Sequence, residues 1–198
     1  GEHNIQGIGD KHVPLIHNVM NTDFVVGISD QATNNLNMIF NTEIGQRYLT
    51  AKKGFHVELI NRLPEFGFSA IANILASIKL AKYMNLGKDD AIITVATDGA
   101  DLYLSELEKT KKEFKGIYDE SMCAEIYGQY LKGISTDHTL ELNQKEKERI
   151  FNLGYYTWVE QQGIDLEDFE KRRDQNFWNG HFQNMLSLDN RVKEFNNI

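Results

Sequence analysis

Two glycines near the start of the chain lie in the first segment whose residue types could take part in ligand binding or catalysis. Gly7 and Gly9 lie one residue apart within the run His3–Pro14. Glycine adopts positive φ without strain and lets the backbone approach a ligand closely, so this run is either an ordinary glycine turn or a loop placed against a ligand. It is not a dinucleotide-binding fingerprint, because a third glycine and a preceding strand are both missing.

Ser69 and Asp98 are further candidates, and each adjoins an apolar run. A serine in front of a long apolar stretch commonly caps a helix, but it can also present its hydroxyl to a ligand. Asp98 follows its apolar run, where it is either a turn residue or a polar group at the carboxyl edge of a sheet. Ser69 is a poor candidate for a hydrolase nucleophile, because the GxSxG elbow is absent.

The histidines and the cysteine indicate no metal site and no nucleophile. His3, His12 and His17 lack the spacing of known zinc sites, so no metal is expected. Cys123 is the single cysteine, and we interpret it as a small buried apolar side chain. One cysteine excludes an intrachain disulfide and suits a reducing compartment, which favours a cytoplasmic location.

The elements expected to position these residues alternate between strands and helices. They are a strand at Phe24–Ile28, a helix at about 31–50 capped by Ser29 or Asp30, a helix at Ala70–Met84 buried on more than one side, and a strand at Ala91–Ala96. A continuous apolar strand is typical of a parallel sheet covered on both faces. The order of these elements predicts an α/β fold with a parallel sheet core and flanking helices.

The character of the chain changes near residue 115, after which it becomes polar and amphipathic. Residues 1–115 are therefore assigned to the α/β part and residues 116–198 to a helical extension. The net charge of −8 disfavours nucleic acid as a partner, because binding phosphates requires clustered Lys and Arg. No apolar run approaches the ~20 residues that a membrane-spanning helix needs, so no membrane partner is expected.

Three segments, taken in this order, resemble one enzyme family. His3-Asn4-Ile5-Gln6-Gly7-Ile8-Gly9, with Pro14 a few residues on, resembles the His-Lys-Ile-Gln-Gly-Ile-Gly loop of cysteine synthase and cystathionine β-synthase. Gly67-Phe68-Ser69-Ala70 resembles the Gly-Ile-Ser-Ser motif that opens a helix in these enzymes. The run Ala91–Leu107 resembles their final core strand, its turn and a following Tyr-Leu-Ser. The chain is thus similar to the carboxyl-terminal half of a pyridoxal-phosphate enzyme of the tryptophan synthase β type, fold type II, over about residues 1–110.

The resemblance implies roles for particular residues. Ser69 matches the family serine whose hydroxyl contacts the pyridine nitrogen of pyridoxal 5′-phosphate, a neutral partner that suits β-elimination better than transamination. Gly7, Ile8 and Gly9 match the loop beside the cofactor and the substrate. Lys11, His12 and Asp98 are expected at the entrance for the substrate. Lys11 and His12 depart from the family, which has small or apolar residues after the loop. Ala70 and Ile71 also depart from it, because the family has a second serine and a glycine there.

The resemblance also implies an incomplete catalytic apparatus. The Schiff-base lysine, the substrate loop and the phosphate loop have no counterpart in this sequence, so the chain alone is expected to be inactive. The parent enzyme would be a homodimer, a lyase or β-replacement enzyme acting on a β-substituted amino acid. Two alternatives remain: a serine/threonine dehydratase-like deaminase, and a non-catalytic interaction module in which the helical extension binds a partner.

Overall fold

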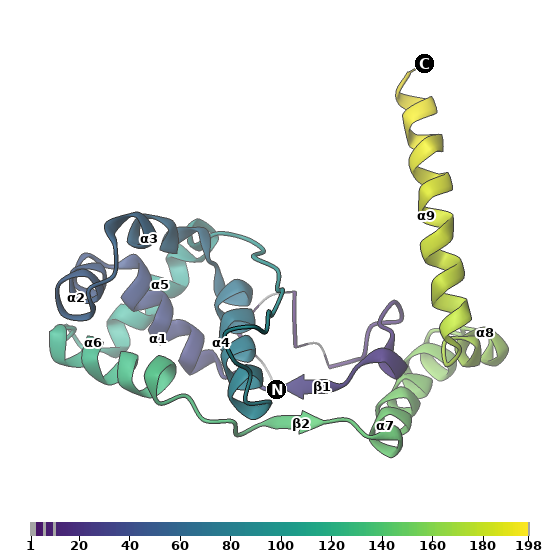
Figure 1. Cartoon of the computed structure of the whole chain (residues 1–198), viewed down its shortest axis with the longest axis horizontal. Helices are drawn as coiled ribbons and strands as arrows, with labels where there is room; N and C mark the ends of the chain where they lie inside the picture. The colour runs from purple at the N-terminus through teal and green to yellow at the C-terminus, as the bar shows by residue number, and fades with distance from the viewer. Residues whose placement is uncertain (1–2, 6, 10, 198) are drawn as a thin grey trace. The chain divides into compact units, whose positions relative to one another are not determined.

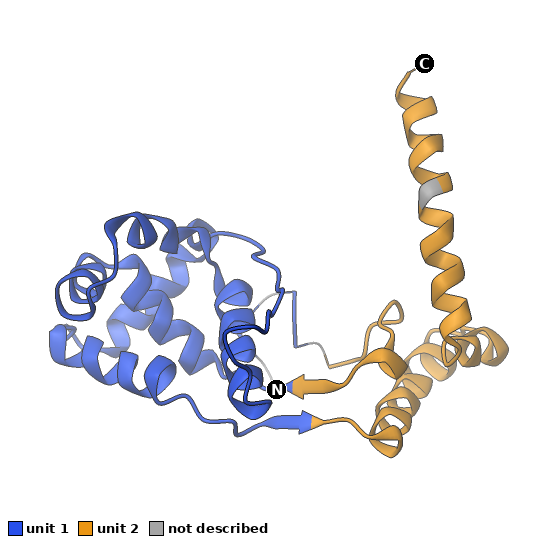
Figure 2. Cartoon of the chain, viewed as in Figure 1, with its two compact units in different colours: residues 1–9, 26–140 blue, residues 10–25, 141–198 orange. Residues whose placement is uncertain are grey.

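The computed structural model describes residues 3–5, 7–9 and 11–197. These divide into two compact units, of which unit 1 holds residues 1–9 and 26–140 and unit 2 holds residues 10–25 and 141–198 (Figure 2). The longer elements, labelled in Figure 1, are β1 (Phe24–Val26), α1 (Asp30–Asn41), α2 (Glu43–Lys53), α3 (Val57–Arg62), α4 (Phe68–Tyr83), α5 (Leu104–Glu113), α6 (Glu120–Tyr127), β2 (Thr139–Glu141), α7 (Gln144–Tyr155), α8 (Leu166–Lys171) and α9 (Gln175–Asn196). Short 3-10 turns occupy Val19–Asn21, Leu63–Glu65 and Ala100–Tyr103, and π-helical turns occupy Gly128–Lys132 and Tyr156–Gln161.

The predicted parallel α/β core of fold type II is wrong. The structure is 65% helical, and its described strands are two antiparallel ones, β1 and β2, in one small sheet. The strand expected at Ala91–Ala96 is an irregular segment in which Ile93 is 96% exposed and Val95 is 65% exposed. The apolar composition of this segment is suitable for a strand, but a strand also needs a neighbour to receive its hydrogen bonds, and the described sheet does not include it.

The helix expected at 31–50 is divided into α1 and α2 at Thr42. Of the two predicted caps, Ser29 is the one that caps α1, because its side chain accepts a hydrogen bond from the amide of Ala32. The Thr42 hydroxyl donates to the carbonyl of Met38 and accepts from the amide of Gly45, at 2.7 and 3.1 Å. Threonine thus ends one helix and caps the next through local bonds that compete with a continuous helix.

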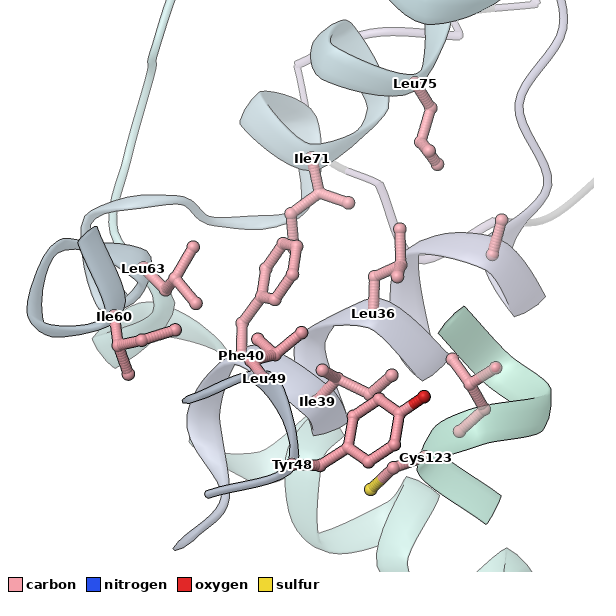
Figure 3. Close-up of a cluster of buried hydrophobic side chains, with 12 residues drawn as sticks. Leu36, Ile39, Phe40, Tyr48, Leu49, Ile60, Leu63, Ile71, Leu75 and Cys123 are labelled. Carbon is pink, nitrogen blue, oxygen red and sulfur yellow. The ribbon is translucent and has the colours of Figure 1, made fainter. Parts of the chain in front are cut away.

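The main core of unit 1 is built from several helices that share apolar faces (Figure 3). The side chains with the least exposure are those of Leu36, Ile39, Leu49, Ile71, Leu75 and Cys123. Cys123 is fully buried, and burial raises the pKa of its thiol, in keeping with the small apolar role expected for it. The prediction that α4 is buried on more than one side is confirmed over its first turns, where Phe68 to Ala72 are all buried.

Unit 2 has a core of its own. Val19, Phe151 and Phe169 are buried together, and the Arg172 guanidinium lies over the rings of both phenylalanines. In the described part of the chain, no helix is long and apolar enough to cross a membrane.

Candidate functional site

The first turn of α4 is the place where the candidate residues gather. Gly67 precedes the helix as its N-cap, and its amide donates to the carbonyl of Asp98 at 2.7 Å. A Cβ at Gly67 would lie only 2.7 Å from the Tyr103 ring and 2.8 Å from the Asp98 carboxylate. The glycine is therefore required here for close approach between the helix start and residues 98–103.

Ser69 does not cap this helix. It lies inside the first turn, is 3% exposed, and has its hydroxyl oxygen 2.5 Å from that of Thr97 and 3.3 Å from Asp98 Oδ1. Thr97 reaches the same carboxylate oxygen at the shorter distance of 2.9 Å. Ser69, Thr97 and the Asp98 carboxylate therefore form one hydrogen-bonded cluster.

Asp98 is half-buried, and its carboxylate accepts hydrogen bonds from several hydroxyl groups. The Tyr103 hydroxyl donates to Asp98 Oδ2 at 2.5 Å. Burial by itself raises the pKa of the Asp98 carboxyl, but the hydrogen bonds from Tyr103, Thr97 and Ser69 outweigh it, and the pKa lies below its usual range. Burial, followed by the bond to Asp98, raises the pKa of Tyr103 to about 12.

The glycine loop packs next to this helix start. Gly7 and Gly9 have φ of +79° and +77°, which confirms the need for glycine, and the His3 ring nitrogen Nε2 lies 2.8 Å from the carbonyl of Gly9. Ile5 is buried against Phe68, Ala72 and Tyr103. The loop, the start of α4 and the segment after residue 96 therefore meet in one place; Gln6 and Asp10 lie outside the described residues.

A cavity of about 370 Å³ adjoins the loop and α4. Its lining includes His3, Ile5, Ile8, Gly9, Val26, Gly27, Ile28, Asp30, Ala72, Asn73 and Ala76. Ala72, Asn73 and Ala76 follow Ser69 by three, four and seven residues, so they share its face of the helix. Ser69 itself is not among the lining residues, because Thr97 and Asp98 cover its hydroxyl.

Comparison with known proteins identifies no family for this chain. No protein-family model, curated protein or solved structure matches the chain. The chemistry of the site therefore rests on its own residues, and the resemblance to cysteine synthase stays a prediction.

Lys11 and His12 belong to unit 2, whereas Gly7, Ile8, Gly9, Ser69 and Asp98 belong to unit 1. Both side chains are exposed, and the His12 ring nitrogen Nδ1 lies 3.0 Å from the Thr157 hydroxyl. Among the residues with described positions, no group of three or more histidine, cysteine, aspartate or glutamate side chains could hold a metal ion.

Three members of the site were not singled out from the sequence. Thr97 and Tyr103 surround Asp98, and the Asn73 side-chain amide donates to the carbonyl of Val95 at 2.9 Å. Asn73 was detectable in principle, because it lies one helical turn after Ser69 on the same face. Thr97 and Tyr103 were not, because their contacts with the helix start depend on how the chain returns to it.

Proposed function

We propose that this chain supplies one wall of the active site of a pyridoxal-phosphate-dependent enzyme of the cysteine synthase type, acting on a β-substituted amino acid. The supporting observation is the convergence of the three segments that carry the resemblance. Ile5 packs on Phe68 and Tyr103, and Ser69 bonds Thr97 and Asp98. A shared cofactor would require these segments to meet, although they are distant in sequence.

The start of α4 carries the serine that the resemblance places beside a pyridine ring nitrogen. The resemblance implies that the Ser69 hydroxyl would be the neutral partner of this nitrogen, which would require the hydroxyl to turn away from Thr97 and Asp98, its partners in this structure. Gly7 leaves open space where a Cβ would stand, so the backbone can approach a bound group. When bound, the cofactor would supply the electron withdrawal that β-elimination requires.

The proposal assigns the Schiff-base lysine and the phosphate loop to polypeptide outside this chain. Lys79 is the buried lysine of unit 1, and its ammonium donates to the carbonyls of Gly27 and Asp137. These bonds hold the Lys79 side chain beside a second cavity, separate from the one next to the glycine loop. We further propose that the complete enzyme is a cytoplasmic homodimer, which the single cysteine and the family resemblance support.

The test uses pyridoxine 5′-phosphate, which lacks the aldehyde and therefore binds only non-covalently. Titration into the isotopically labelled chain up to about 10 mM, a range that covers weak binding, should shift the amide NMR signals of residues 7–9 and 69–73. Ser69→Ala should reduce the shifts, because the buried hydroxyl is removed. Ser77→Ala is the matched control, since Ser77 lies on the same helix and its hydroxyl donates to the carbonyl of Asn73. Absence of shifts, or shifts confined to other residues, overturns the proposal.

A second measurement concerns the lysine. Pyridoxal phosphate followed by borohydride should leave no stoichiometric adduct on any one lysine of this chain. A stoichiometric adduct on Lys79, located by peptide mass spectrometry, would show that the imine-forming lysine lies inside the chain and would overturn its assignment to outside polypeptide.

A further inference from the structure

Helix α9 carries an exposed apolar stripe that the proposed function does not use. Its side chains from His181 to Asn196, apart from that of residue 186, whose side chain is not described, are all exposed. The large apolar ones are Phe182 at 71%, Met185 at 59%, Leu188 at 54%, Val192 at 55% and Phe195 at 76% exposed. Figure 1 shows α9 as one continuous helix in yellow. Such a concentration of exposed apolar side chains marks a surface that another molecule covers.

Four residues of the stripe follow the seven-residue repeat of a coiled coil, and Phe182 lies beside them. Taking Trp178 as position a, the a positions are Trp178, Met185 and Val192, and the d positions are His181, Leu188 and Phe195. Five of these six residues are apolar. Trp178 is half-buried and its ring nitrogen donates to the carbonyl of Arg172, so the exposed part of the repeat runs over 181–195. A repeat of 3.5 residues keeps one seam of a helix facing another helix, so the pattern specifies a helical partner.

The polar face of α9 argues against a membrane or nucleic acid as that partner. The charged residues of α9 are Asp189, Arg191, Lys193 and Glu194, which sum to zero. A helix that lies on a lipid surface typically has a polar face rich in Lys and Arg, and phosphate binding needs the same residues. Lys193 is in addition paired with Asp189 at 3.1 Å.

We propose that α9 pairs with α9 of a second copy of this chain in an antiparallel coiled coil. The stripe is self-complementary in this arrangement, since every a position meets a d position. Met185 then packs on Leu188 of the second copy, and His181 packs on Val192. A parallel pair would instead bring two His181 rings together in the seam, which costs desolvation of both.

The e and g positions, which flank the a and d positions, are compatible with the antiparallel pairing. In antiparallel coils, g positions meet g positions and e positions meet e positions, which sets Asn184 beside Arg191 and Phe182 beside Asp189 of the second copy. No two like charges are juxtaposed. This interface is independent of the cofactor proposal, because none of its residues belongs to unit 1.

Sedimentation equilibrium of the full chain tests the partner. The chain should dimerise between about 1 and 200 µM, the range expected for a short interface. Leu188→Glu places a charge in the seam and should weaken the dimer about tenfold or more. Gln183→Glu adds the same charge on the opposite face and should leave it unchanged. A monomer at every concentration, or a dimer that persists in Leu188→Glu with unchanged affinity, overturns the proposal.

Disulfide trapping tests the orientation with exposed polar positions, whose replacement leaves the fold intact. A mixture of the Asn184→Cys and Arg191→Cys chains should form a mixed disulfide on oxidation. A disulfide between Asn184→Cys and Asp189→Cys chains instead indicates a parallel coil, and absence of both links indicates that the helices do not pair; either result overturns the proposed arrangement. Buried Cys123 serves as the internal non-reacting thiol.

Discussion

At the scale of single residues, Asp98 is a half-buried carboxylate of unit 1 whose charge is stabilised by several hydrogen bonds. One carboxylate accepts bonds from Tyr103, Thr97 and Ser69, which come from two separate stretches of chain. Its lowered pKa means that the folded state favours the anion. This contribution to stability is present at neutral pH and is lost as pH falls through the lowered pKa, below the usual value near 3.8.

The contribution of the Tyr103 hydroxyl to stability depends on pH in the opposite direction. Its pKa is raised from 10.0 to about 12, so its contribution is present below pH 10.0 and is lost as pH rises toward about 12. Tyr103→Phe keeps the ring that stacks on Phe68 at 4.4 Å but removes a donor from Asp98. We expect a loss of about 1–3 kcal/mol at neutral pH and a higher pKa of Asp98.

NMR titration of the Asp98 carboxyl carbon, together with urea unfolding at several pH values, checks this prediction. Tyr156→Phe is the control, because Tyr156 is 65% exposed and lies in unit 2. An unchanged pKa of Asp98 in Tyr103→Phe would mean that the tyrosine does not set the charge state of the site.

At the scale of elements, α4 joins the core to the candidate site. Its first turn carries Ser69, and Leu75 further along is fully buried in the main cluster of unit 1. Leu75→Ala should cost about 2–5 kcal/mol, since it removes buried methyl groups and leaves a cavity. Ile74→Ala should cost clearly less, because Ile74 is only half-buried. Chemical denaturation of both variants compares the two costs, and equal losses would mean that α4 packs through a different face.

At the scale of the whole molecule, the two units have separate cores, which can be tested by local perturbation. Phe169 is fully buried in unit 2 with Phe151 and Val19. Phe169→Ala should cost about 3–5 kcal/mol in that unit and should speed hydrogen exchange of amides in α7 and α8. Amides of α1 and α4 should keep their protection. Equal acceleration in α1 would show instead that the chain unfolds as one cooperative body.

Local features were predictable from the sequence alone. Ser29, one of the two expected caps, caps α1, Gly7 and Gly9 take positive φ, and the strand predicted at Phe24–Ile28 forms over Phe24–Val26. Each depends on a residue and its immediate neighbours, through a cap, a missing Cβ or β-branched side chains. The heptad stripe of α9 is equally a property of spacing along one helix, although its exposure is not.

The pairing of distant segments was decided by the tertiary structure. Ala91–Ala96 has the composition of a buried strand, yet it stays exposed, and β1 pairs with β2 from more than a hundred residues later in the chain. The contact of Ser69 with Thr97 likewise spans 28 residues. Composition specifies how strongly a segment favours burial or extension, but which segment receives its hydrogen bonds depends on where the rest of the chain lies, and that is a property of the fold as a whole.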